Sequence, residues 1–160
     1  KNVKFKQFQF LKNEAIKKLT ALEQEPLRLR NRTVEACLSA DAVMLAYIGD
    51  AVYSMYVRER VVQMNITKVQ VLHTIVTEFI CAKSQAKVLL EIEDTFTEQE
   101  QAIARRARNS NVNVPKSSSV QEYRSSTAFE AVLGFLYETC QDERLQHIME
   151  QAFSITLRGM

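Results

Sequence analysis

The sequence has few of the residues that interrupt helices. Only three glycines and two prolines occur among its 160 residues, and the turn dipeptides that join β-hairpins are missing. Long uninterrupted helices are therefore expected, and hairpin-rich folds are excluded. We predict an all-α fold.

Metal-binding and disulfide-forming side chains are also scarce. Cys37, Cys81 and Cys140 are too few and too widely spaced for a disulfide framework or a C-x-x-C zinc site. The two histidines, His73 and His147, are distant from one another and do not complete such a site. We expect all five side chains to pack in the core.

The chain has no long hydrophobic segment. No apolar run approaches the roughly 20 residues of a membrane helix. The sequence also does not show the basic start followed by an apolar region that is typical of secreted proteins. The hydrophobic content of 46% is enough for one compact domain with a proper core. We expect a cytoplasmic protein that does not associate with membranes.

The net charge of +2 conceals an uneven distribution. Residues 1–32 carry +6, so the remainder of the chain sums to −4. We assign residues 1–36 to a basic N-terminal extension with a linker at 27–36, and residues 37–160 to the main domain. Apolar residues between Phe8 and Leu22 recur every three or four positions, which predicts a basic helix ending near Pro26.

That basic helix has three possible contacts. It could lie on RNA, on a membrane surface or on its own domain. Docking on its own domain, with the lysines in solvent, is the favoured interpretation.

The main domain is predicted to contain five helices, at about 41–63, 67–92, 97–108, 120–139 and 142–157. Ser39 and Asp41 are both suitable N-cap residues for the first of them, Thr67 can cap the second, and Thr97 begins the third. The buried stripe of the second is expected to include Val69 and Leu90.

Two of these helices each carry one isolated acid. Asp50 is the only charged residue from 42 to 57, and Glu130 is the only one from 125 to 137. A carboxylate in apolar surroundings is costly unless it is paired, hydrogen-bonded or bound to a cation. We therefore expect each acid to have a compensating partner. Gly49 and Gly134 lie near the two acids and are small enough for another helix to approach closely.

The two acids would meet if their helices packed against each other. Two adjacent carboxylates repel, which raises a pKa or calls for a cation. Mg²⁺ takes oxygen ligands and binds through one or two carboxylates together with a substrate phosphate, an arrangement suited to phosphodiester hydrolysis. In the alternative, each acid forms a structural ion pair with an arginine such as Arg58 or Arg124.

A basic cluster ends the helix predicted at 97–108. Arg105, Arg106 and Arg108 suit a helix C-terminus, which gives them a structural explanation. Three arginines in four positions exceed that need, and arginine is well suited to phosphate contacts. Residues 109–119 contain Pro115, are rich in Asn and Ser, and are expected to form an exposed loop that carries Lys116.

Four segments together resemble one known family. They are LAYIGDAVY at 45–53 with YVR at 56–58, RRARN at 105–109, VPK at 114–116 and YRSSTAFEAVLGFLY at 123–137. In this order they resemble the ribonuclease III superfamily, and most of all its Mini-III branch, which has the catalytic domain without a double-stranded-RNA-binding domain. The similarity extends from about residue 38 to 155.

The resemblance implies a helical bundle like the ribonuclease III endonuclease domain, acting as a homodimeric, Mg²⁺-dependent endoribonuclease on double-stranded RNA. The Mini-III substrate is usually precursor large-subunit (23S) ribosomal RNA, and a large-subunit ribosomal protein can assist. The implied catalytic and metal-binding residues are Asp50 and Glu130. The implied RNA-binding residues are Arg105, Arg106, Arg108, Lys116 and Arg124.

Two positions depart from the broader superfamily. Ala46 and Thr127 stand where that superfamily has a glutamate and an aspartate, a reduced set that Mini-III members generally share. The number of metal ions per site therefore stays open. Two other functions also stay open: a catalytically silent RNA-binding or ribosome-associated protein with the same fold, and a helical protein-interaction module with ion-paired acids.

Overall fold

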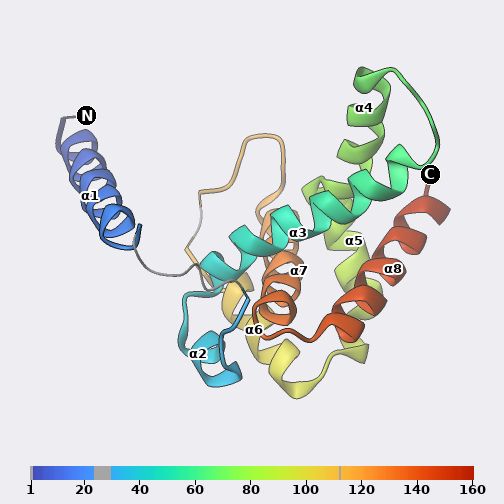
Figure 1. Ribbon diagram of the computed structural model, residues 1–160. Helices are drawn as coiled ribbons and strands as arrows, with labels where there is room; N and C mark the ends of the chain where they lie inside the picture. The colour runs from blue at the N-terminus through green and yellow to red at the C-terminus, as the bar shows by residue number, and fades with distance from the viewer. Residues whose placement is uncertain (1, 24–29, 112) are drawn as a thin grey trace.

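The computed structural model describes residues 2–23, 30–111 and 113–160, and within these ranges it is all-α, as predicted (Figure 1). None of the described helices is both long and apolar enough to cross a membrane. The elements are α1 (Asn2–Ala21), α2 (Val34–Ser39), α3 (Ala42–Val62), α4 (Val69–Ile80), α5 (Ala82–Ile92), the short 3-10 helix η1 (Glu93–Thr95), α6 (Glu98–Arg108), α7 (Val120–Glu138) and α8 (Asp142–Arg158).

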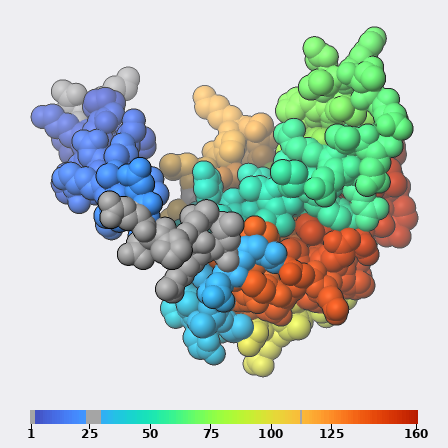
Figure 2. All heavy atoms as spheres, viewed as in Figure 1, coloured from blue at the N-terminus to red at the C-terminus, as the bar shows by residue number. Residues whose placement is uncertain are grey.

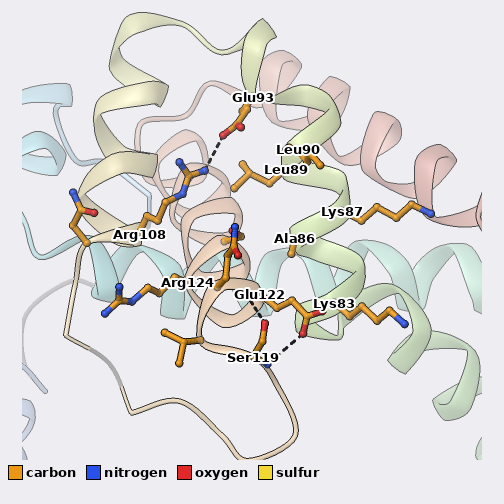
Figure 3. Close-up of a pocket in the computed structure, with 14 residues that line it drawn as sticks. Lys83, Ala86, Lys87, Leu89, Leu90, Glu93, Arg108, Ser119, Glu122 and Arg124 are labelled. Carbon is orange, nitrogen blue, oxygen red and sulfur yellow. Dashed lines mark hydrogen bonds and ion pairs between the residues drawn. The ribbon is translucent and has the colours of Figure 1, made fainter.

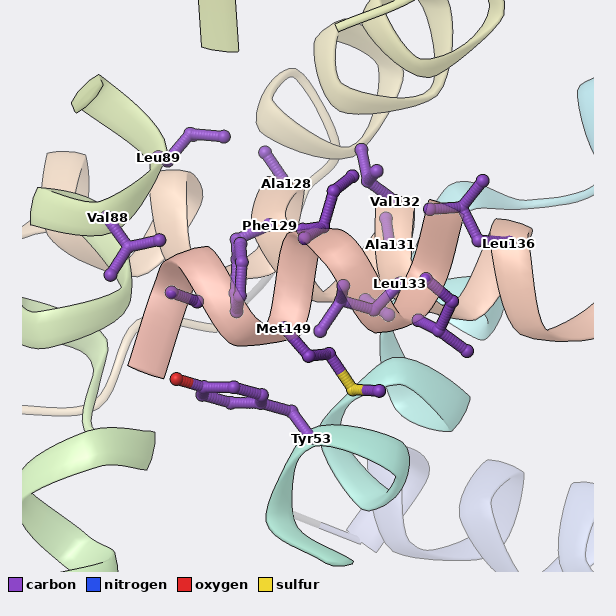
Figure 4. Close-up of a cluster of buried hydrophobic side chains, with 14 of the residues drawn as sticks. Tyr53, Val88, Leu89, Ala128, Phe129, Ala131, Val132, Leu133, Leu136 and Met149 are labelled. Atoms are coloured by element: carbon purple, nitrogen blue, oxygen red, sulfur yellow. The ribbon is translucent and has the colours of Figure 1, made fainter. Parts of the chain in front are cut away.

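Helix α7 is the centre of the bundle. Apolar residues occupy all of its sides rather than one stripe, which is the pattern of a helix enclosed by others. Helices α3, α5, α6 and α8 pack around it, with the most extensive contact made by α3. The core contains Phe129 and Leu133 of α7, and the ring of Tyr53 from α3 meets Phe129 edge to face at a centroid distance of 5.2 Å (Figure 4).

Side-chain caps set the beginnings of α2, α3, α6 and α7. Asp41 accepts a hydrogen bond from the backbone N–H of Val43, and Thr97 forms a capping box with Glu100. Asp41 rather than Ser39 therefore caps the first helix and Thr97 caps the third, whereas the prediction of Thr67 as a cap is wrong, because the N-cap of α4 is Lys68, which makes no side-chain cap bond. Ser119 begins α7 with a second capping box, so this helix starts one residue after the exposed loop.

The single helix predicted at 67–92 is wrong, because the chain breaks at Cys81 into α4 and α5. Cys81 has an extended backbone with ψ of 153°, and the hydroxyl of Ser84 donates to the carbonyl of Glu78 at 2.6 Å. The break changes the direction of the buried stripe. Val69 and Leu90 are 70% and 73% exposed, so their predicted burial is also wrong.

The basic helix α1 does not dock on the bundle, contrary to the favoured interpretation. It extends away from the other helices, and its side chains form a separate mass at one side of the molecule (Figure 2). Phe5, Phe8 and Phe10 are 61–63% exposed. Within the predicted linker 27–36, the structure adds the short helix α2, while Pro26 and residues 27–29 lie outside the described residues.

The expected burial of the cysteines and histidines is only partly met. Cys37 is the buried residue of α2, whereas Cys81 is half-buried at the break between α4 and α5. Cys140, His73 and His147 are exposed, so the prediction that they pack in the core is wrong. The thiol of Cys140 donates to the backbone carbonyl of Arg30 at 2.6 Å.

Candidate active site

The crossing of α3 and α7 brings two helix backbones into direct contact. A methyl carbon on Gly49 would lie 1.7 Å from the carbonyl oxygen of Glu130, and one on Gly134 would lie 1.9 Å from the carbonyl oxygen of Leu45. Only glycine fits at either place. The two glycines therefore let the isolated acids, one next to Gly49 and the other one turn before Gly134, come together.

Asp50 and Glu130 have different environments at this crossing. Glu130 is half-buried, whereas Asp50 is exposed. The sequence argument that Asp50 needs compensation because its helix is apolar is therefore wrong, since its side chain is directed to solvent. The condition for the two acids to meet is satisfied, because α3 packs on α7 and Asp50 is near enough for its charge to raise the pKa of Glu130.

The proximity of the acids changes the acidity of Glu130. Burial, which disfavours the charged form, and the negative charge of Asp50 together raise the pKa of Glu130 to about 8. The neighbouring amide of Gln85 acts in the opposite direction and favours the charged carboxylate. In the absence of a cation, the site therefore holds a proton at neutral pH.

The alternative of separate arginine pairs is not supported by the structure. Within the described residues neither acid forms an ion pair, and the guanidinium of Arg58 instead donates to the hydroxyl of Ser54 at 3.2 Å. Glu100 shows what a paired buried acid looks like here. It is 1% exposed and receives Nε of Arg144 at 2.8 Å.

Two polar residues beside Glu130 were not found from the sequence. Gln85 on α5 is 1% exposed, and its amide oxygen accepts a hydrogen bond from the hydroxyl of Ser126 on α7. Ser126 lies one helical turn before Glu130 on α7, and Gln85 faces that turn from α5. The available signal was that Gln85 falls on the same helical face as the core residues Val88 and Leu89, where a glutamine is unexpected.

The positions of the two missing superfamily acids offer no substitute ligand. Ala46 is 4% exposed in the core. Thr127 is 6% exposed, and its hydroxyl donates to the backbone carbonyl of Tyr123 at 2.9 Å. Among the described residues, no group of three or more acidic, histidine or cysteine side chains is placed to hold a metal. The carboxylates here are thus a pair.

A pair of this kind fits a hard divalent cation. Mg²⁺ binds through one or two carboxylates and completes its shell with waters and substrate oxygens. A cation between Asp50 and Glu130 would replace the proton that their repulsion otherwise retains. The donor set therefore suits a cation that also contacts a phosphate.

The predicted RNA-binding residues fall into two groups. Arg106 donates to the backbone carbonyls of Leu38 and Ala40, which places it on the end of α2, and Arg108 pairs with Glu93 at 2.7 Å. Arg105, Lys116 and Arg124 are exposed and form no ion pair with another described residue. The second group is available to a polyanion.

A basic groove lies beside the helices that carry Gln85 and Glu130. It has a volume of about 880 Å³ and is bounded by α5, the end of α6 and the start of α7 (Figure 3). Its basic lining residues are Lys83, Lys87, Arg108 and Arg124. Glu93 and Glu122 also line it, although Glu93 is neutralised by Arg108 and Glu122 forms the capping box with Ser119.

Comparison with known proteins places this geometry in a family. Residues 43–141 match the Ribonuclease III domain family. The chain is 42% identical to Mini-ribonuclease 3 of Thermoanaerobacter sp. over 77% of this chain and 87% of that protein. It is 39% identical to Mini-ribonuclease 3 of Symbiobacterium thermophilum over 76% and 95%. A crystal structure of a Fusobacterium nucleatum protein superposes with a TM-score of 0.67 at 29% identity, covering 70% of this chain and 92% of that one.

The matched segment contains the elements of the site. It runs from the start of α3 to just beyond α7, and so includes both acids and the groove. Members of the ribonuclease III family are generally dependent on divalent metals, act on double-stranded RNA and form dimers. The chain therefore belongs to the ribonuclease III family, within its Mini-ribonuclease 3 group, and is an endoribonuclease.

Proposed function

We propose that the protein is a Mg²⁺-dependent endoribonuclease that cleaves double-stranded RNA, with Asp50 and Glu130 as its catalytic and metal-binding residues. The observation that carries this proposal is the carboxylate pair at the crossing of α3 and α7. Its mutual repulsion contributes to the raised pKa of Glu130, and no arginine or lysine among the described residues pairs with it. The pair needs a cation to be fully charged at neutral pH.

The two acids have separate parts in this site. When bound, Mg²⁺ supplies charge neutralisation at the phosphate and an activated water. Asp50 is exposed, so a cation bound to it can also contact the substrate. Glu130 is half-buried and is held in place by the helix crossing. With Ala46 and Thr127 at the positions of the other superfamily acids, we propose that these two carboxylates are the protein's only contribution to the metal site.

We propose that the duplex backbone lies along the basic side of the site. A-form RNA is recognised mainly through its shape and its phosphates, and lysine and arginine supply most non-specific affinity. Arg105, Lys116 and Arg124 are the exposed candidates, joined by Lys83 and Lys87 in the groove. Arg106 binds the end of α2, and Arg108 pairs with Glu93. We propose that these two arginines affect RNA binding partly by fixing the positions of α2 and Glu93.

The N-terminal extension is proposed as an accessory RNA-binding element. Helix α1 carries five lysines and only one acid, Glu14, which is paired with Lys17 at 3.1 Å. It extends away from the bundle and leaves its basic side chains accessible (Figure 2). We propose that residues 1–36 add duplex affinity to a catalytic domain at 37–160. The natural substrate we propose is precursor large-subunit ribosomal RNA, and we propose that a large-subunit ribosomal protein assists its cleavage.

A second copy of the chain is proposed as a partner. The helix that carries Asp50 also presents Met44 and Tyr47, which are 56% and 81% exposed. Both line a hollow of about 400 Å³ whose other apolar lining residues also belong to α3. Large exposed apolar side chains around a hollow favour a two-fold contact, in which the same surface of each copy packs against the other.

One assay tests this function directly. The purified protein is incubated with labelled duplex RNA and with the corresponding single strand, each in Mg²⁺ and in a chelator, and both binding and cleavage are recorded. We expect cleavage of the duplex in Mg²⁺ only, with duplex binding retained in the chelator. Cleavage of single-stranded RNA at an equal rate, or cleavage in the chelator, would contradict the proposal.

A further inference from the structure

Gln85 is an unusual residue for the core of this bundle. It lies on the buried face of α5, is 1% exposed, and has both of its amide atoms enclosed by α5 and α7. Its oxygen accepts from Ser126, but its Nε2 group completes no hydrogen bond of ordinary geometry. A buried donor without a partner destabilises a protein, so leucine would be the more stable choice for packing alone.

The orientation of this amide follows from its neighbours. Ser126 and Glu130 are one helical turn apart on α7, so both can face the same residue of α5. When a cation keeps Glu130 ionised, its carboxylate can accept hydrogen bonds but cannot donate them, so the NH₂ end of Gln85 is the end that can bind it. The hydroxyl of Ser126 can donate, and it fixes the oxygen end of the amide.

We infer that Gln85 is a positioning residue that orients the Glu130 carboxylate for a divalent cation, and that Ser126 in turn orients Gln85. This inference rests on the proposed function, because it takes Glu130 as a metal ligand. The Nε2 group is placed to hold one carboxylate oxygen, which leaves the other for the cation. In metal sites, an outer residue of this kind sets the angle of the ligand and is costly to remove.

The test measures metal binding by the RNA-free protein. Mn²⁺, a paramagnetic ion that prefers the same oxygen ligands as Mg²⁺, is titrated into wild type and variants and followed by electron paramagnetic resonance. Gln85→Leu should raise the Mn²⁺ Kd by about tenfold or more, as outer-residue removal does in other metal sites. Ser126→Ala should raise it by a smaller factor, and both variants should keep the helical circular dichroism signal and melt no lower than wild type by more than a few degrees.

Two further variants separate the possible outcomes. Gln151 on α8 also has a buried amide atom without a partner, so Gln151→Leu controls for the general effect of this replacement and should leave the Mn²⁺ Kd unchanged. Glu130→Gln should abolish the site. If Glu130→Gln weakens Mn²⁺ binding but Gln85→Leu and Ser126→Ala do not, the positioning role is wrong and the proposed function survives. If Glu130→Gln has no effect on binding either, the metal site itself is wrongly assigned.

Discussion

The replacement Gly49→Ala tests the helix crossing on which the site depends. The added methyl carbon would lie 1.7 Å from the carbonyl oxygen of Glu130 and 2.9 Å from the backbone nitrogen of Gly134. Ordinary van der Waals contact begins near 3.4 Å, whereas the methyl carbon would lie 1.7 Å from the carbonyl oxygen of Glu130. The helices would therefore have to separate by about 1.7 Å, the difference between 3.4 Å and 1.7 Å. The obstructing atoms are backbone atoms, which cannot rotate away as the end of a side chain can.

The expected loss of stability follows from two opposing effects. Overpacking a close helix contact costs up to about 3 kcal/mol, while alanine is favoured over glycine inside a helix by about 1 kcal/mol. The net destabilisation should be about 2 kcal/mol, which lowers the Tm of a domain of this size by roughly 4–8 °C. Separation of the helices should also move Asp50 from Glu130 and weaken Mn²⁺ binding.

Gly159→Ala is the matched control for this experiment. Gly159 follows the end of α8, and the nearest atom to an added methyl there is the flexible Nζ of Lys87 at 3.1 Å. Its free energy of unfolding should change by less than about 0.5 kcal/mol. Denaturant unfolding and calorimetry measure both variants. A Gly49→Ala protein as stable as wild type, with unchanged Mn²⁺ binding, would refute the close-contact reasoning.

Three other outcomes are expected. Because folding raises the pKa of Glu130 from 4.5 to about 8, the folded metal-free protein holds this proton more tightly than the unfolded chain, so its stability should fall as pH rises from about 5 to 8. Denaturant melts in a chelator should show this decline in wild type and not in Glu130→Gln, and equal slopes would contradict it. Arg105→Ala with Arg124→Ala should weaken binding to every duplex sequence alike and reduce the salt slope by about one per residue, whereas Arg106→Ala should lower stability because it releases the end of α2. Tyr47→Ser should shift light-scattering mass from dimer to monomer, and a dimer of unchanged strength would place the interface elsewhere.

The sequence predicted the central helices well because their boundaries are set locally. Asp41 and Thr97 cap their helices through their own side chains, and both were identifiable from residue type and spacing. These caps need no knowledge of the tertiary structure. The meeting of Asp50 and Glu130 was predicted only on the condition that their helices pack together, and the glycine near each acid permits that close contact.

The sequence did not predict the break at Cys81 or the burial of individual side chains. The break has neither glycine nor proline, and it depends on the hydroxyl of Ser84 reaching the carbonyl of Glu78 across the turn. Asp50 was expected to be buried because its helix is apolar, yet which face of α3 meets α7 is decided by tertiary packing. Gln85 was missed for the same reason, because its importance lies in the neighbours that folding brings to it.

The central claim is that Asp50 and Glu130 together hold the catalytic metal ion. The most direct measurement is cleavage of a labelled RNA duplex in Mg²⁺ by Asp50→Asn and by Glu130→Gln, with duplex binding and the melting curve recorded on the same samples. We predict that each variant loses cleavage while its folding and its duplex affinity stay close to those of wild type. Cleavage at the wild-type rate by either variant would contradict the assignment of the site.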